Sequence, residues 1–128
     1  MTPPSFFHAS LLVALGGGAG AWLRYAVGRL VGVTGFPWAT LSVNVAGSLA
    51  MGLLAGWLAR HGTGGEGWRL LLGVGLLGGF TTFSAFSLEL ALMIERGELA
   101  TAAAYILVSV AAGVIGLFAG LAAMRIVA

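Results

Sequence analysis

Residues 78–89, GGFTTFSAFSLE, lie within a long apolar run but contain paired glycines, paired threonines, two serines and a carboxylate. Glycine has the weakest helix preference short of proline, and threonine is β-branched with a hydroxyl that competes for backbone hydrogen bonds. We therefore predict that a helix crossing this region breaks around residues 78–82. Broken backbone at membrane depth is tolerated only where it is buried in protein or lines a cavity.

The composition predicts an integral membrane protein. Of the 128 residues, 59% are hydrophobic and only 8% are charged, whereas a water-soluble domain carries about 25% charged residues. The charged set is six arginines and four glutamates, net +2, which is too few groups to indicate nucleic-acid binding. The absence of cysteine excludes disulfides, thiolate nucleophiles and cysteine metal sites.

Four apolar stretches are long enough to span a bilayer, whose hydrocarbon core of about 30 Å needs about 20 helical residues. They cover residues 6–31, 38–59, 68–94 and 99–124, separated by short polar connections. No basic segment precedes Arg24, so we expect the first stretch to be retained rather than cleaved as a signal peptide. The predicted fold is one all-α transmembrane domain of four helices, the third broken mid-membrane.

The distribution of arginines predicts dual topology. Four spans place both termini on one side, with three arginines on that side and three on the other: Arg60, Arg69 and Arg125 against Arg24, Arg29 and Arg96. The positive-inside rule then has almost no bias to act on. We expect insertion in both orientations and an antiparallel homodimer; a single topology, fixed by one arginine nearer the interface, is the alternative.

Glycines four residues apart predict close contacts between helices, because small residues let helix backbones approach in lipid. Such pairs occur in every predicted span: Gly16 with Gly20, Gly28 with Gly32, Gly52 with Gly56, Gly75 with Gly79, and Gly116 with Gly120. They predict tight packing without identifying the partner.

Polar residues in two of the spans repeat with helical spacing. The sets are Thr40, Asn44 and Ser48 in the second span and Thr101, Tyr105 and Ser109 in the fourth. Residues four apart share one helix face, so each helix presents a stripe of neutral hydrogen-bonding groups. Interhelical hydrogen bonding is the alternative interpretation. Two matched stripes beside a broken helix favour a lined pathway.

The broken segment also contains groups that suit ions. Phe83 and Phe86 are three residues apart and share a face; aromatic ring edges are positive and can stabilise a small anion, although lipid contact or packing is the alternative. Backbone carbonyls freed at a break can coordinate a cation. His8 and His61 lie at span ends, and no nucleophile stands with a base or metal cluster, so we do not expect an enzyme.

Three motifs in order, GGGAGAWLRY (16–25), TLSVNVAGS (40–48) and GGFTTFSAFSLE, together resemble the CrcB/Fluc family of small bacterial fluoride channels. The resemblance implies an antiparallel dual-topology dimer in the bacterial inner membrane, with membrane lipid around it and two fluoride pores. It also implies passive export of fluoride and hence fluoride resistance.

The resemblance assigns roles to individual residues. It implies that Asn44 donates to fluoride and that Phe83 and Phe86 line the two paths. Tyr105 and Ser109 match pore-lining positions of the last helix, and Thr40 extends that track. A structural sodium ion at the dimer axis is implied on the backbone carbonyls of two further residues, Gly78 and Thr81.

Two charged residues match the family motifs without a settled role. Glu89 resembles a vestibule carboxylate, and Arg24 matches the arginine of the first-helix motif. Arg24 could snorkel to the interface or pair with a carboxylate.

Two other kinds of protein stay open as alternatives. A proton-coupled small multidrug exporter also has four short helices, but it needs a carboxylate deep in the first span, where this sequence has none; Glu89 is the only acidic residue well inside any span. A structural subunit of a larger membrane complex would leave the two polar stripes unexplained.

Overall fold

The computed structural model describes residues 2–127, and every regular element in that range is helical. Three long helices are α1 (Phe6–Val31), α2 (Trp38–His61) and α6 (Leu99–Ile126). Between α2 and α6 the chain forms a segmented leg: η1 (Gly62–Gly65), α3 (Glu66–Trp68), the π-helix η2 (Arg69–Leu77), α4 (Gly78–Phe80) and α5 (Ser84–Glu95). The expected all-α fold is confirmed.

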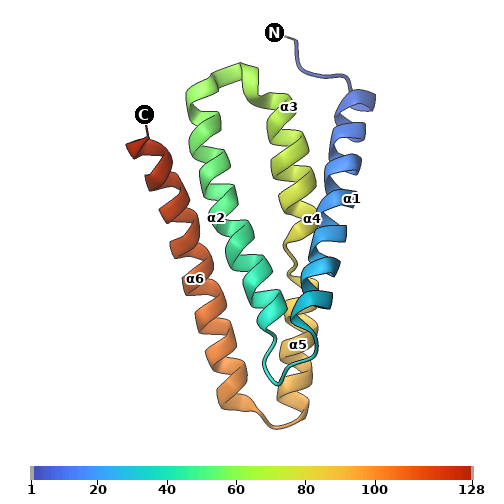
Figure 1. The fold of residues 1–128 in the computed structure, drawn as a ribbon, viewed down its shortest axis with the longest axis vertical. Coiled ribbons are helices and arrows are strands. Elements are labelled where there is room, and N and C mark those ends of the chain that lie inside the picture. The colour runs from blue at the N-terminus through green and yellow to red at the C-terminus, as the bar shows by residue number, and fades with distance from the viewer. Residues whose placement is uncertain (1, 128) are drawn as a thin grey trace.

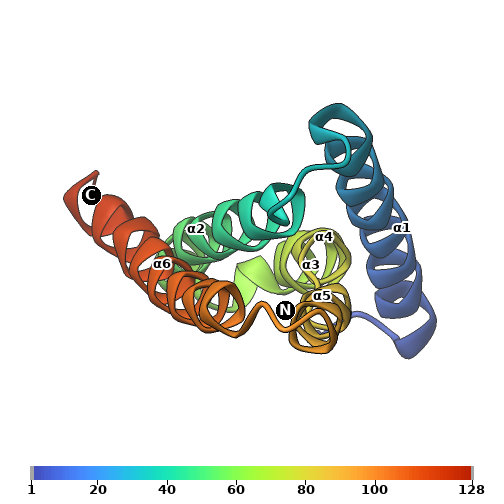
Figure 2. The same cartoon turned by 90° about the horizontal axis from the view of Figure 1, so that it is seen from below.

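The helices lie side by side along one long axis (Figure 1). The chain reverses at η1, so the segmented leg runs antiparallel to α2, and both termini lie at the η1 end of the molecule. Seen end-on, α1 and α6 occupy opposite flanks, with α2 and the leg between them (Figure 2). Both ends of the chain that the structure describes are therefore on the same side.

Within residues 2–127, three helical stretches are long and apolar enough to cross a membrane: Phe6–Val31, Trp38–Glu95 and Leu99–Ile126. The second stretch includes the reversal at η1, and so contains two antiparallel legs. The helix bounds lie close to the expected ranges; α2 and α6 each run two residues beyond them. This arrangement indicates a membrane protein.

Local chemistry explains where α1 begins and ends. The Ser5 side chain accepts a hydrogen bond from the His8 N–H at 3.2 Å, which satisfies one of the unpaired donors of the first turn. Gly32 follows the last residue with φ +75°, a left-handed conformation that glycine adopts without strain. Gly97 plays the same part between α5 and α6, with φ +76°.

Close packing of α1 against the segmented leg depends on glycine. A Cβ atom on Gly16 would lie 2.2 Å from the Leu71 carbonyl oxygen, and one on Gly20 would lie 2.0 Å from that of Leu76. Any side chain at these positions would force the two helices apart. The predicted close contact is confirmed here.

A second glycine contact joins α2 and α6, and the predicted pairs are not all equivalent. A Cβ on Gly52 would lie 2.1 Å from the Leu117 carbonyl oxygen, so this approach also requires glycine. At Gly28 and Gly32 a Cβ would meet nothing in the described chain within 4 Å, so these two glycines make no close helix contact within the protomer. Gly32 serves as the end of α1 instead.

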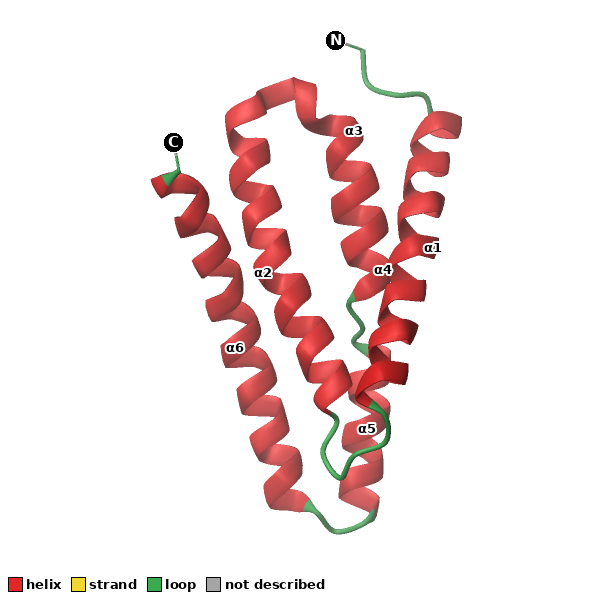
Figure 3. Ribbon diagram, in the orientation of Figure 1, coloured by secondary structure: helices red, strands yellow, loops and turns green. Residues whose placement is uncertain are grey.

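The segmented leg breaks at residues 81–83, between α4 and α5 (Figure 3). Thr81 has extended backbone angles, φ −80° and ψ 156°, and helical structure resumes at Ser84. The Thr81 hydroxyl donates to the Leu77 carbonyl at 2.9 Å and its N–H donates to the same oxygen at 3.0 Å. The predicted break is confirmed.

Gly78 and Gly79 stay helical, contrary to expectation. The role of Gly79 is to allow close packing against α1. A Cβ on Gly79 would lie 2.4 Å from the Gly17 carbonyl oxygen, so α1 leaves no room for one. The sequence also did not predict the nine-residue π-helix that precedes α4. π-Helical turns are rare in proteins, and those that occur often lie at functional sites.

Candidate functional site

Asn44 of α2 holds the break by two hydrogen bonds to one residue. Its Nδ2 donates to the Thr82 carbonyl at 2.9 Å, and its Oδ1 accepts from the Thr82 N–H at 2.8 Å. A carboxamide carries two N–H donors, so one donor remains after these contacts. The side chain that the sequence marked as an ion donor is therefore also the clamp of the interrupted backbone.

Gly47, on the same helix as Asn44, leaves room for the broken segment to pack against α2. A Cβ on Gly47 would lie 2.2 Å from Cγ2 of Thr81, so the threonine side chain fills the space that glycine leaves open. On the far side of the break, the Thr82 hydroxyl accepts the Ala85 N–H at 3.1 Å and caps the first turn of α5. Both ends of the break are thus supported by specific polar contacts.

The break leaves backbone carbonyls without helical partners, because the N–H groups they would pair with lie in non-helical backbone. The Gly79 carbonyl accepts a hydrogen bond from Arg24 Nε at 3.2 Å, and the Thr82 carbonyl accepts from Asn44. Among the hydrogen bonds of residues 2–127, none reaches the carbonyls of Gly78 or Thr81. These two oxygens remain available, and unpaired carbonyl oxygens suit a cation.

A pocket of about 300 Å³ opens beside the break. It brings Asn44 and Ser48 of the α2 stripe to the broken segment, whereas Thr40 does not line it, and Leu117 of α6 lies on one side. Its lining consists of Asn44, Gly47, Ser48, Met51, Leu77, Thr81, Thr82, Phe83 and Leu117.

A row of aromatic rings leads from the break towards α6. The ring centroids of Phe83 and Phe86 are 5.8 Å apart, and those of Phe86 and Tyr105 are 4.9 Å apart in an edge-on arrangement. Phe83 is 78% exposed in the protomer, whereas Phe86 is 9% exposed. Phe36 completes the row, 5.2 Å from the Tyr105 ring; sequence reasoning missed it, because its segment signalled only a turn before Pro37.

The Glu89 carboxylate accepts hydrogen bonds from two hydroxyls, one on α2 and one on α6. Thr40 Oγ1 donates to its Oε1 at 2.5 Å, and the Tyr105 hydroxyl donates to its Oε2 at 2.6 Å. Hydrogen bonds to a charged acceptor are stronger than neutral ones. The structure thus places Thr40 and Tyr105 with the carboxylate, a connection between the two predicted stripes that their spacing alone did not reveal.

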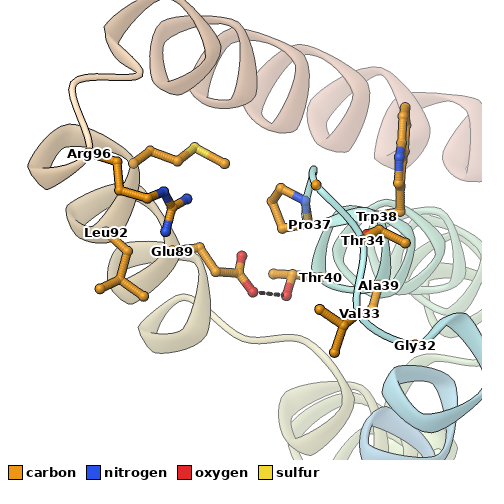
Figure 4. A pocket seen from close by; sticks show the side chains of 12 residues that line it. Gly32, Val33, Thr34, Pro37, Trp38, Ala39, Thr40, Glu89, Leu92 and Arg96 are labelled. Atoms are coloured by element: carbon orange, nitrogen blue, oxygen red, sulfur yellow. Dashed lines mark hydrogen bonds between the residues drawn. The ribbon is translucent and has the colours of Figure 1, made fainter.

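The carboxylate faces a pocket of about 270 Å³ at the end of the bundle opposite the termini (Figure 4). The connection between α1 and α2 forms one wall, and α5 forms the other, with Arg96 at its edge. Glu89 therefore lies at one end of the bundle, and its role as a vestibule carboxylate stays a prediction.

Ser109 lies one helical turn beyond Tyr105 on α6. Its hydroxyl oxygen is buried and has no hydrogen-bond partner in the part of the chain that the structure describes. A buried polar group without a partner costs free energy, so this hydroxyl is available to a ligand. Ser48 lies near the same helix: a Cβ built on Gly113 would be 3.5 Å from its hydroxyl.

Arg24 approaches the break from α1 by the hydrogen bond to Gly79 already described, and it is part-buried. The ion pairs among residues 2–127 join Arg69 to Glu66 and Arg96 to Glu98. Arg24 therefore does not pair with a carboxylate in the protomer, which was one of the two expectations for it.

The fold and the site define a multi-pass helical membrane protein whose polar groups gather around an interrupted helix. Residues 11–121 match the model of the family described as CrcB-like protein, Camphor Resistance (CrcB). The chain belongs to this family.

Related proteins carry the name fluoride-specific ion channel FluC. The chain is 61% identical over 125 residues to the one from Novosphingobium aromaticivorans, covering 94% of this chain and 98% of the relative. It is 58% identical to that of Phenylobacterium zucineum, covering 92% and 96%, and 54% identical to that of Rhodopseudomonas palustris, covering 90% and 95%. The family is one of ion channels and not of enzymes.

Proposed function

We propose that this protein is a fluoride-selective channel that lets fluoride leave the cell passively across the bacterial cytoplasmic membrane. The observation that carries the proposal is the 61% identity to a fluoride-specific ion channel over 94% of the chain. The geometry of the break supports it, because Asn44 and Phe83 line one pocket there and the rings of Phe83, Phe86 and Tyr105 form a row that begins beside it.

Fluoride is small and strongly hydrated, so its passage requires donors that replace the lost water. The remaining N–H of Asn44 and the unpartnered hydroxyl of Ser109 supply such donors. The positive ring edges of Phe83 and Phe86 stabilise an anion without a formal charge that would trap it. Tyr105 and Thr40 extend the track to Glu89, which lies in the vestibule.

The working unit is proposed to be an antiparallel homodimer with four membrane crossings in each subunit and two pores in the pair. The two legs of residues 38–95, together with α1 and α6, support four crossings. The equal split of six arginines supports both orientations. The exposure of Phe83 in the protomer supports a partner that completes the path, and exposed apolar side chains on α6 support surrounding lipid.

A structural sodium ion at the dimer axis fits the chemistry of the break. The Gly78 and Thr81 carbonyls have no donor among the described residues, and they lie at the carboxyl end of a half-helix, where the dipole is negative. When bound there, sodium would offset repulsion between the fluoride ions of the two pores and join the subunits.

The decisive experiment is fluoride efflux from liposomes that contain the purified protein, read with a fluoride electrode. Valinomycin carries potassium as the compensating charge, and chloride efflux is followed in parallel. Rapid fluoride efflux that requires valinomycin, with chloride retained, is expected. Absence of efflux from verified dimers would refute the proposal. Proton uptake coupled to fluoride efflux would indicate fluoride/proton antiport, which moves charge and therefore also depends on valinomycin.

The alternative of a proton-coupled small multidrug exporter gains no support. The relatives named above are fluoride channels, and α1 contains no carboxylate. Drug-driven proton release from the same liposomes would be the result that favours it.

A further inference from the structure

Arg24 lies at the end of the closest helix contact in the protomer. Gly16, Gly20 and Arg24 are four residues apart, so they share one face of α1. The first two positions have no room for a Cβ atom, which would lie 2.2 Å and 2.0 Å from carbonyl oxygens of η2. Backbone contact along this face brings the guanidinium of Arg24 to the last turn before the break.

At that turn Arg24 acts on one carbonyl. In an uninterrupted helix the Gly79 carbonyl would accept the N–H of Phe83, but Phe83 lies in the break. Arg24 Nε donates to it at 3.2 Å instead. The nearby carbonyls of Gly78 and Thr81 receive no donor from residues 2–127. Arg24 therefore occupies one carbonyl of the break and leaves these two without a donor.

Charge adds to this hydrogen bond. The carboxyl end of a helix carries partial negative charge, and a cation placed there is stabilised. An arginine within an apolar helix is costly unless it has a partner. Arg29, one turn further along α1, is exposed at the helix end and provides a comparison of the same residue type in the same helix.

We propose that Arg24 is a positioning residue of the break. It caps the half-helix that ends at Phe80 and occupies the Gly79 carbonyl, which is then unable to bind a cation. By fixing this turn, Arg24 keeps the Gly78 and Thr81 carbonyls and the Asn44–Thr82 hydrogen bonds in their observed positions. Its importance for transport rests on the proposed function, because the break borders an ion path only if the protein is a channel.

The test is amide hydrogen exchange in lipid nanodiscs, measured by mass spectrometry, on Arg24→Met, Arg24→Lys and Arg29→Met. Loss of a charged cap should speed exchange in peptides covering residues 78–84 by about tenfold or more in Arg24→Met. Peptides of α6 should be unchanged. Arg24→Lys keeps an N–H donor and the charge and should return exchange close to the original rate, and Arg29→Met should match the unchanged protein.

Fluoride efflux is measured on the same samples. We expect Arg24→Met to lose efflux with the dimer intact and Arg24→Lys to recover most of it. Unchanged exchange at residues 78–84 in Arg24→Met, or a rise of equal size in α6, would overturn the positioning role. If Arg24→Met does not fold, Arg24→Leu, which also has no N–H donor for the Gly79 carbonyl, is judged by the same criteria.

The two proposals fail separately. If the unchanged protein moves no fluoride, the proposed function is wrong, while the exchange rates still decide whether Arg24 holds the break.

Discussion

Asn44 and Thr82 are joined by two antiparallel hydrogen bonds, 2.9 Å and 2.8 Å long, although 38 residues separate them in the chain. The amide of α2 thereby takes the place of backbone partners that the interrupted helix has lost. Because one N–H of the same amide remains unused, the residue that stabilises the break also faces the pocket beside it.

Asn44→Asp should weaken both the stability of the break and the passage of fluoride. The carboxylate can still accept the Thr82 N–H, but the Thr82 carbonyl loses its donor, at a cost of about 1–3 kcal/mol. The new negative charge would also repel an anion on the path, so fluoride efflux should fall by about tenfold or more. Thermal unfolding and liposome efflux measure the two effects.

The matched control for Asn44 is Ser42→Ala. Ser42 lies on the same helix, is exposed, and its hydroxyl donates only to the carbonyl of Trp38. Stability and efflux should both be unchanged in this variant. An Asn44→Asp protein as stable as the original would contradict the clamp.

Phe83→Ile should abolish fluoride efflux and leave the dimer intact, because isoleucine keeps apolar bulk but has no ring edge to offer an anion. Efflux is measured in liposomes and the oligomeric state by size-exclusion chromatography. Phe7→Ile is the control, because Phe7 is 74% exposed on α1 and Phe83 is 78% exposed. Normal efflux from Phe83→Ile would remove the ring from the mechanism.

Tyr105→Phe and Thr40→Val should destabilise the protein non-additively, because both hydroxyls donate to the same carboxylate, that of Glu89. Each single change should cost about 1.5–3 kcal/mol, the range for hydrogen bonds to charged groups. The double variant should differ from the sum by about 0.5 kcal/mol or more. Denaturant unfolding of all four proteins provides the cycle.

Tyr105→Phe keeps the ring, which packs against Phe86 and Phe36. A loss of stability in that variant therefore reports on the hydroxyl. Strict additivity in the cycle would show that Thr40 and Tyr105 do not share Glu89 in the folded protein.

Gly20→Ala should separate α1 from the segmented leg, because its Cβ would lie 2.0 Å from the Leu76 carbonyl oxygen. Overpacking of this kind costs about 1–3 kcal/mol. Gly18→Ala on the same helix meets nothing among the described residues within 4 Å, and alanine favours helix, so stability should hold or rise. Equal melting temperatures for the two variants would be inconsistent with the α1 contact.

Sodium should stabilise the assembled protein if it binds the Gly78 and Thr81 carbonyls. Replacing sodium by N-methylglucamine, which is too large for the break, should lower the melting temperature, and adding sodium back should raise it along a saturable curve. Potassium at the same ionic strength is the control. A melting temperature that does not respond to sodium would argue against this site.

Much of the fold can be predicted from the local chemistry of the sequence. The apolar runs specify helices near the observed bounds, and the threonines at 81 and 82 specify the break, because helix preference depends on a residue and its nearest neighbours. Spacing of four placed Asn44 and Ser48 on one face of α2, and both line the pocket at the break. The family resemblance also singled out Asn44, but it assigned no role to Ser48.

Tertiary structure decided which polar groups meet. Thr40 reaches Glu89 across 49 residues, and Arg24 reaches Gly79 across 55. The spacing of residues within one helix specifies a face, but not the rotation of that face towards another helix. Phe36 joined the aromatic row for the same reason, since only the packed connection between α1 and α2 brings it to Tyr105.

The sequence by itself determined an all-helical membrane chain, the position of its break and the residue types beside it, because these depend on hydrophobicity and local backbone preference. The tertiary structure alone decided that Gly79 stays helical against α1, that Asn44 clamps Thr82, and that Glu89 collects hydroxyls from two helices. Each of these depends on how closely two helices approach and how each is turned, and in this chain glycines without room for a Cβ set that approach.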